Sequence, residues 1–306
     1  FYSDPQSESV ENYMSFKDSI DQALKICPNP DLMISAGDTT QNGYKSTEWE
    51  ACFEVMGDYY AKYPTVTVAG NHEMKGDWNF VSFAQRFNMS GAKTGYPQFD
   101  RTMGYFEYGD AIFVILNGEV TPADQKAEIM KKELQWCKSV LDASDKKWRI
   151  VMTHAGPYTS NHDPLDVRDY YINDSEYSLD AMGVDLFLNG HDHIYIRSTV
   201  KNDIKVNTGD GTTYLTGGTV GNKFYEYIPA RSDYSTDFYT DEEDKQVFSI
   251  IEFSEDSIKG TAYQKQDADN WNSFKAVDSY EIRNTLREGK SVTDYTDVPA
   301  NAWYYK

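Results

Sequence analysis

The sequence of 306 residues is poor in cysteine and contains no long apolar run. The three cysteines, Cys27, Cys52 and Cys137, are an odd number without metal-ligand spacing, which argues against a disulfide framework and favours small buried thiols. No stretch approaches the roughly 18 apolar residues that span a bilayer, so we expect no membrane insertion. The first residues show neither an initiator Met nor a signal peptide, and we expect the sequence to be an excerpt from a longer protein.

Positive charge is also scarce. The chain has 29 Lys and Arg residues against 49 Asp and Glu residues, which gives a net charge of −20 at pH 7. A surface of this sign repels nucleic-acid backbones and anionic membranes. Nucleic-acid binding is therefore excluded as the main role, and an anionic substrate would need local metal cations to hold it.

What the sequence does contain is an alternation of short apolar runs with amphipathic stretches, which predicts a layered α/β domain. The expected strands of this first part cover residues 32–36, 65–69, 149–152 and 184–189. Residues 105–108 and 111–116, separated by Gly109-Asp110, predict a hairpin, and residues 122–141 predict a helix.

The pattern changes after His193, because helical periodicity is nearly absent from there on. Four further strands are expected, and we interpret them as a second, largely antiparallel sheet packed on the first. They cover residues 194–199, 213–216, 247–253 and 258–263. Residues 229–245, rich in Asp, Ser, Thr and Tyr, are expected to form a long surface loop.

Side chains suited to binding metals follow these apolar runs, and four of the five histidines, His72, His154, His191 and His193, stand at the ends of runs. The candidates are Asp4, Gln6, Asp38, Asn71, His154, His191 and His193. An α/β scaffold gathers side chains at the carboxyl ends of its strands, and carboxylates, amide oxygens and imidazoles suit hard divalent metals. Each motif alone has another interpretation, such as a turn, a capping pair or a satisfied core histidine. Their order together predicts one site.

In this order the motifs resemble the five-block signature of calcineurin-like metallophosphoesterases, and they are most similar to the purple acid phosphatase branch. The five blocks are Asp4-Pro5-Gln6, Gly37-Asp38, Gly70-Asn71-His72-Glu73, Val151-Met152-Thr153-His154 and Gly190-His191-Asp192-His193. The resemblance implies a four-layer αββα sandwich, a dinuclear metal centre and hydrolysis of phosphate esters. It covers roughly residues 1–265, which would form the catalytic domain, with residues 266–292 as its extension or a linker.

The family pattern also implies how the ligands divide between two metal ions. Asp4, Asp38 and His193 would hold one ion, with Gln6 as a further ligand. Asp38, Asn71, His154 and His191 would hold the other, so that Asp38 is the bridge. The chain departs from the pattern at Gln6, where many members have histidine, and at Gln41, where purple acid phosphatases have a tyrosine ligand. Metal identity therefore stays open among Fe, Zn and Mn.

The same resemblance implies in-line attack on phosphorus by a hydroxide held between the metals. His72 is expected to face the substrate and assist the leaving group, the alternative being that it only hydrogen-bonds a loop. His162 matches a histidine that contacts substrate phosphate, the alternative being plain surface exposure. Glu73 would orient His72 or cap the following turn.

The leading function is hydrolysis of phosphomonoesters in small phosphorylated compounds. A phosphodiesterase or nucleotide pyrophosphatase on the same core is one alternative. A non-catalytic surface-binding protein is another, motivated by Gln6 and Gln41.

Residues 293–306 resemble the start of an S-layer homology module, which attaches bacterial surface proteins to cell-wall polymers. This resemblance implies an extracellular protein held at a bacterial cell wall, with a wall polymer as a partner. The alternative is an aromatic tail that packs on the catalytic domain.

Overall fold

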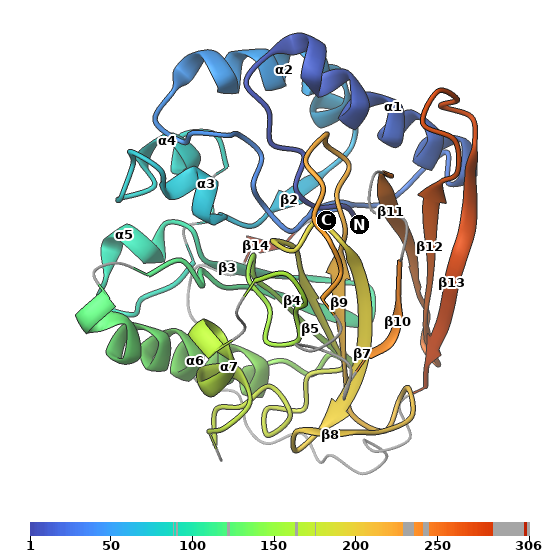
Figure 1. Ribbon diagram of the computed structural model, residues 1–306. Helices are drawn as coiled ribbons and strands as arrows, with labels where there is room; N and C mark the ends of the chain where they lie inside the picture. Colours follow the sequence, from blue (N-terminus) through green and yellow to red (C-terminus); the bar gives the residue numbers. More distant parts are fainter. Residues whose placement is uncertain are drawn as a thin grey trace.

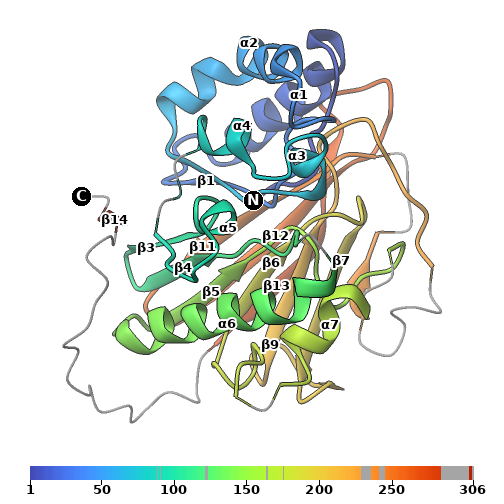
Figure 2. The ribbon, with the colours of Figure 1, turned by 90° about the vertical axis from the view of Figure 1, so that its left-hand side faces the viewer.

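The computed structural model describes residues 1–283, except 88, 90, 121–122, 163–164, 175, 229–235 and 241–244, together with residues 303–304. Two β-sheets pack face to face between two layers of helices (Figures 1 and 2). The expected α/β class and αββα sandwich are confirmed. Within the described part of the chain, no helix combines the length and apolar character needed to cross a membrane.

The larger sheet has the strand order β10-β7-β9-β6-β5-β4-β3-β14. Its centre, from β4 through β5 and β6 to β9, is parallel, whereas β3, β7 and β10 pair antiparallel with their neighbours and β14 is parallel to β3. The strands are β3 (Gly104–Tyr108), β4 (Ala111–Ile115), β5 (Trp148–Met152), β6 (Leu186–Asn189), β7 (Tyr195–Lys201), β8 (Ile204–Lys205, paired with β7), β9 (Thr212–Gly217), β10 (Thr236–Tyr239) and β14 (Trp303–Tyr304). The predicted hairpin is the β3–β4 pair.

Two expectations for the second half of the chain are wrong in part. Strands β7 and β9 belong to the larger sheet, because β9 lies parallel beside β6 and β7 returns antiparallel to β9. The expected surface loop at residues 229–245 contains β10, which pairs with β7. β9 is rich in threonine yet buried along its whole length, and Thr212 satisfies its hydroxyl by donating to the Val184 carbonyl at 2.8 Å.

The second sheet contains the antiparallel strands β11 (Val247–Phe253), β12 (Ile258–Lys265) and β13 (Phe274–Ile282). The parallel pair β1 (Met33–Ser35) and β2 (Thr65–Thr67) is joined to it by the first residues of the chain. Tyr2 donates its N–H to the Ile34 carbonyl at 2.9 Å, and the Phe1 carbonyl accepts the Ser249 N–H at 2.9 Å. Tyr2 also forms an isolated parallel bridge with Ser35, so Asp4 follows a segment that runs beside β1.

The helices cover the outer faces of the two sheets. α1 (Val10–Ile26) and α2 (Ser46–Lys62) pack on the second sheet, and α6 (Lys126–Ala143) and α7 (Leu165–Tyr171) on the larger one (Figure 2). α6 begins four residues later than predicted and follows the 3-10 turn η1 (Ala123–Gln125). The remaining helices are single turns, α3 (Asn71–Met74), α4 (Val81–Ala84) and α5 (Pro97–Asp100).

Three apolar cores separate the four layers. The core between the sheets contains Phe113, Ile150, Leu188, Leu215 and Ile258. Cys137 lies in the core under α6 and Cys52 in the core under α1 and α2; both are buried thiols, and Cys27 is half-buried. The predicted S-layer homology segment at residues 293–306 lies outside the described residues, apart from Trp303 and Tyr304 in β14.

The core between the sheets yields a stability prediction. Ile150 in β5 is fully buried, so Ile150→Ala leaves a cavity and should lower the free energy of unfolding by about 2–5 kcal/mol. The matched control Ile204→Ala removes the same atoms at a position that is 67% exposed, and it should change stability by less than about 0.5 kcal/mol. Urea denaturation followed by tryptophan fluorescence measures both. Equal losses in the two variants would contradict the assigned core.

Candidate metal centre

The seven candidate ligands converge at one edge of the two sheets. Asp4 follows the first strand segment, Asp38 follows β1, and Asn71 begins α3 after β2. His154 follows β5, and His191 and His193 follow β6. Both sheets therefore contribute ligands, and the site lies where their carboxyl ends meet.

One group of ligands surrounds His154. Its Nε2 lies 3.2 Å from Asp38 Oδ2, 3.1 Å from Asn71 Oδ1 and 3.2 Å from His191 Nδ1. His154 Nδ1 lies 2.8 Å from the Ala36 carbonyl, which requires the proton on Nδ1 and leaves Nε2 as a ligand atom. Asp38, His154 and His191 thus offer ligand atoms within 4.8 Å of one another.

The second group consists of Asp4, Asp38 and His193, whose ligand atoms also lie within 4.8 Å of one another. His193 Nε2 is 3.4 Å from Asp4 Oδ1, and Gln6 Nε2 is 3.1 Å from His193 Nε2 and 3.3 Å from Asp38 Oδ2. Asp38 belongs to both groups. The structure therefore brings all seven predicted ligands together in the two sets that the family pattern implies, with Gln6 beside the second.

Several of these ligands have an unusual backbone conformation. Asp4, Asp38, His191 and His193 have φ angles of 52°, 54°, 75° and 55°, in the left-handed region that non-glycine residues rarely adopt. Such strain persists where the surrounding structure enforces it, and it is common at functional sites. An added Cβ at Gly70 would lie 2.2 Å from Asp38 Oδ1, and one at Gly190 would lie 2.6 Å from Asp4 Oδ2. Glycine is required at both positions, because the backbone approaches the ligands so closely.

Glu73 fixes the loop that carries Asp38. Its buried carboxylate accepts hydrogen bonds from the N–H groups of Asp38, Thr39, Thr40 and Gly70, at 3.0, 2.7, 3.0 and 2.8 Å. Of the two roles left open by the sequence, the structure shows capping, because Glu73 accepts the Gly70 N–H at the start of α3. Glu73 also binds a loop 33 residues upstream, which the sequence did not indicate.

Asp192 plays the corresponding part for the loop after β5, and sequence reasoning assigned it no role. Its buried carboxylate accepts the N–H groups of Ser160, Asn161 and His162 and lies 2.9 Å from His162 Nδ1. The His162 ring then packs on His191 at a centroid distance of 3.8 Å. No local signal in the sequence marks this role, because the N–H groups that Asp192 binds lie 30 to 32 residues upstream.

His72 is buried beside the ligands. Its N–H donates to Asp38 Oδ1 at 2.9 Å, and its Nδ1 lies 2.8 Å from the Gln41 carbonyl. The backbone of Gln41 thus anchors His72. Gln41 is the residue that stands where the resemblance implies a tyrosine ligand. Burial lowers the pKa of His72, which favours the neutral ring with its proton on Nδ1.

The electrostatics of the ligand set favour a bound cation. Burial lowers the pKa of His191 to about 2 and that of His193 to about 3, so both rings are neutral ligands at ordinary pH. Burial raises the pKa of Asp4 to about 7. Burial alone would raise the pKa of Asp38 too, but the adjacent His154 holds it below its ordinary value.

The donor set itself fits two metal ions. Imidazole nitrogens, carboxylate oxygens and the Asn71 amide oxygen face one another with their lone pairs. This arrangement is electrostatically unfavourable unless a cation lies between them. The buried Gln6 Oε1 has no hydrogen-bond partner among the described residues, and rotation of the amide by 180° would direct this oxygen toward Asp38 and His193. The site residues are thus compatible with the dinuclear centre that the family implies.

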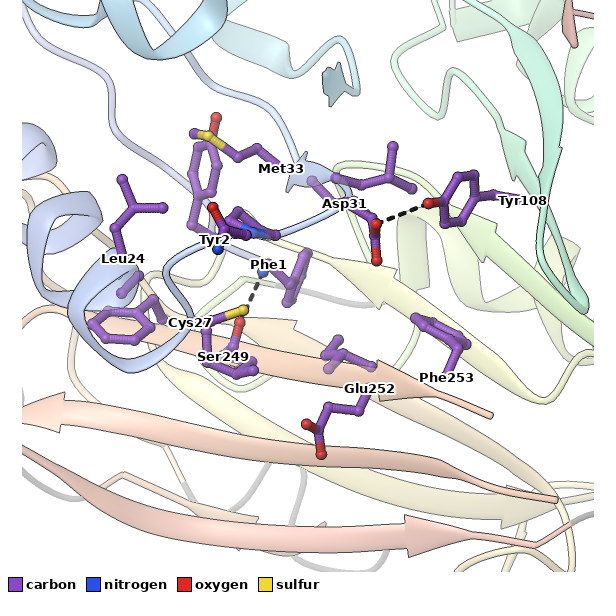
Figure 3. Close-up of a pocket in the computed structure, with 18 of the residues that line it drawn as sticks. Phe1, Tyr2, Leu24, Cys27, Asp31, Met33, Tyr108, Ser249, Glu252 and Phe253 are labelled. Carbon is purple, nitrogen blue, oxygen red and sulfur yellow. Dashed lines mark hydrogen bonds between the residues drawn. The ribbon is translucent and has the colours of Figure 1, made fainter. Parts of the chain in front are cut away.

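A separate cavity of about 390 Å³ lies between α1, β1 and β11 (Figure 3). Its walls include Leu24, Met33 and Phe253, and none of the seven candidate ligands lines it. Asp31 at its edge accepts a hydrogen bond from the Tyr108 hydroxyl at 2.8 Å (Figure 3). This apolar cavity lacks the convergent ligands of the metal centre.

The pKa of Asp4 predicts how metal affinity depends on pH. Below about pH 7 the Asp4 carboxyl is protonated in the metal-free protein, so an incoming cation must displace a proton. The apparent Kd for Zn²⁺ or Mn²⁺ should therefore rise at least about tenfold for each pH unit below 7. Competition with a chelator at pH 5, 6, 7 and 8 measures this. Asp4→Asn should bind more weakly but with a flatter pH dependence, and an affinity that is constant from pH 5 to 7 in the unaltered chain would refute the assignment.

The role of Glu73 gives a second prediction. Glu73→Gln keeps the shape of the side chain but replaces an acceptor oxygen by an amide NH₂ that faces backbone N–H groups. The Asp38 loop should loosen, and metal affinity should fall about 10- to 100-fold, as for other residues that hold metal ligands in place. Glu281→Gln, on β13 and outside the candidate ligand set, is the control for the same substitution and should bind metal normally. Unchanged affinity in Glu73→Gln would show that the loop does not depend on this carboxylate.

Comparison with known proteins agrees with this geometry. The model of the calcineurin-like phosphoesterase family matches residues 1–195. Purple acid phosphatase 18 from Arabidopsis thaliana is 28% identical over 200 residues, which cover 61% of this chain and 43% of that protein. Purple acid phosphatase 15 from the same plant is 26% identical over 182 residues, covering 57% and 32%. The matched part of this chain thus spans less than half the length of these two relatives.

Solved structures show the same fold at low sequence identity. Purple acid phosphatase PPD1 from yellow lupin (Lupinus luteus) seeds superposes with a TM-score of 0.67 at 16% identity, over 94% of this chain and 53% of that one. GAP50, the anchor in the inner membrane complex of Plasmodium, gives 0.62 at 16% identity, over 94% and 88%. Because the family model covers well over half of the residues and the ordered motifs lie within or at the end of that match, this chain belongs to the calcineurin-like phosphoesterase family.

Proposed function

We propose that this protein hydrolyses phosphomonoesters with the help of two metal ions. The observation that carries the proposal is the pair of ligand groups that share Asp38. Asp4, Asp38 and His193, with Gln6, would hold one ion, and Asp38, Asn71, His154 and His191 the other. Fe, Zn and Mn all suit such a mixed set of oxygen and nitrogen ligands.

When bound, the two cations would lower the pKa of a water molecule from about 16 toward 7 and neutralise charge on the phosphoryl oxygens. The chain's own residues then hold the substrate. His162 is proposed to contact the phosphoryl group through Nε2, because Asp192 fixes its Nδ1 and its side chain is still 33% exposed. His72 is proposed to face the leaving group from beside Asp38, in the orientation set by Gln41.

Two other functions remain to be tested against this one. A phosphodiesterase or nucleotide pyrophosphatase would use the same ligands, and the contacts described above do not depend on the number of ester bonds. A non-catalytic binding protein would bind metal without turnover, and the amides at Gln6 and Gln41 motivate that alternative.

The substrate preference can be measured with p-nitrophenyl phosphate and bis(p-nitrophenyl) phosphate, each with added Zn²⁺, Mn²⁺ or Fe²⁺. We expect faster hydrolysis of the monoester, and loss of at least about 100-fold in kcat/KM in Asp38→Asn, which removes the shared charge. Asp256→Asn, at a side chain that is 89% exposed, is the control and should keep full activity. Faster diester hydrolysis would replace the monoesterase proposal. Two metal equivalents without any turnover would support the binding protein.

The location of the protein is a separate proposal. We infer an extracellular protein at a bacterial cell wall from the resemblance of residues 293–306 to an S-layer homology module. Binding to purified cell-wall polymer, measured for the chain with and without this segment, would test it.

A further inference from the structure

Two lysines approach His72 from different parts of the chain. Lys75 Nζ lies 2.9 Å from His72 Nδ1 and 3.0 Å from Nε2, and Lys223 Nζ lies 3.4 Å from the same Nε2. Because the Gln41 carbonyl requires the proton on Nδ1, the Nε2 lone pair accepts from the lysines. Two ammonium groups therefore meet at one imidazole nitrogen, beside the shared Asp38.

This arrangement is unusual in a chain with a net charge of −20. Among the described residues, no carboxylate lies within 4.0 Å of either ammonium group, although many acidic side chains were available as partners. Burial lowers the pKa of Lys75; the Asp38 carboxylate opposes this shift, and the like charge of Lys223 adds to it. Two half-buried cations held close together are unfavourable unless an anion binds between or beside them.

The same elements that hold the metal ligands also hold the lysines. Lys75 caps α3, which begins at the ligand Asn71. The Lys223 carbonyl is bonded to His193 Nδ1, so the lysine that reaches His72 also fixes a ligand of the other metal set. Its ammonium group lies 5.1 Å from the Tyr225 ring centre, and that ring lies 4.5 Å from the His193 ring. The two cations are thus part of the wall of the metal centre rather than free surface side chains.

We propose that Lys75 and Lys223 form an anion subsite that binds a second phosphate group of the substrate, next to the phosphoryl group that is cleaved. This inference rests on the proposed function. The preferred substrates would then carry two adjacent anionic groups, as a nucleoside diphosphate does, rather than one. Lysine suits this role, because its compact ammonium group interacts with phosphate as a point charge.

Hydrolysis of such a substrate is balanced with water alone. The water oxygen forms a bond to the terminal phosphorus, and the bridging P–O bond breaks with its electron pair left on the nucleoside monophosphate. One proton is released to solvent at neutral pH. The lysines would stabilise the charge that develops on the leaving phosphate.

The experiment compares ADP with AMP, which differ by one phosphate on the same nucleoside, using the chain saturated with Mn²⁺ and, in parallel, Zn²⁺. Phosphate release gives kcat/KM for each nucleotide. Lys75→Met and Lys223→Met should each lower the ADP/AMP ratio of kcat/KM at least tenfold. Lys75→Arg, which keeps the charge, should keep the ratio within threefold. Lys259→Met, on β12, is the control for loss of a lysine and should leave the ratio unchanged.

Equal losses for ADP and AMP would overturn the proposal, because the lysines would then act only by positioning His72. An unchanged ratio would overturn it as well. If the unaltered chain hydrolyses neither nucleotide, the proposed function fails, and calorimetric binding of ADP and AMP decides the subsite separately. Binding of ADP that weakens at least tenfold in the Met variants, with AMP less affected, supports the subsite, and equal weakening refutes it. Metal content and unfolding temperature establish that each variant is folded.

Discussion

The structure depends on one carboxylate that two ligand sets share. Asp38 contacts His154 on one side and lies within ligand distance of Asp4 and His193 on the other. Imidazole nitrogens and carboxylate oxygens that are buried and crowded in this way are stable only with a positive charge among them. Burial lowers the pKa of His154, but the carboxylates of Asp38 and Asp4 outweigh this effect and hold the pKa well above its ordinary value. In the metal-free protein the protonated His154 ring therefore supplies part of that charge. A metal pair can take over this role.

The loops around Asp38 are shaped to maintain this crowding. Four ligands adopt left-handed backbone conformations, and glycines beside them let the chain approach without a clash. Glu73 and Asp192 then bind the backbone N–H groups of the two loops, one carboxylate for each. Buried acceptors of this kind offset the strain, because each carboxylate oxygen replaces water for several donors at once.

The fold class, the hairpin and the convergence of the ligands could be predicted from the sequence, because each depends on local signals: apolar runs, turn residues and ligand side chains at strand ends. The sheet assignment of β7, β9 and β10 could not, since it depends on which distant strand lies alongside. The long-range contacts of Glu73, Asp192 and Lys223 could not be predicted either. Their partners lie about 30 or more residues away, and nothing in the local sequence marks such contacts.

The ligands are divided between the two sheets. Asp4, Asp38 and Asn71 follow strands on one side of the sandwich, and His154, His191 and His193 follow strands on the other. A cation bound by both groups would cross-link the loops of the two sheets at the edge of the sandwich where the ligands lie. Metal binding would then raise the free energy of unfolding, and this contribution would vary with the concentration of free metal. At low metal concentration the whole molecule would therefore be less stable, in addition to turning over less substrate.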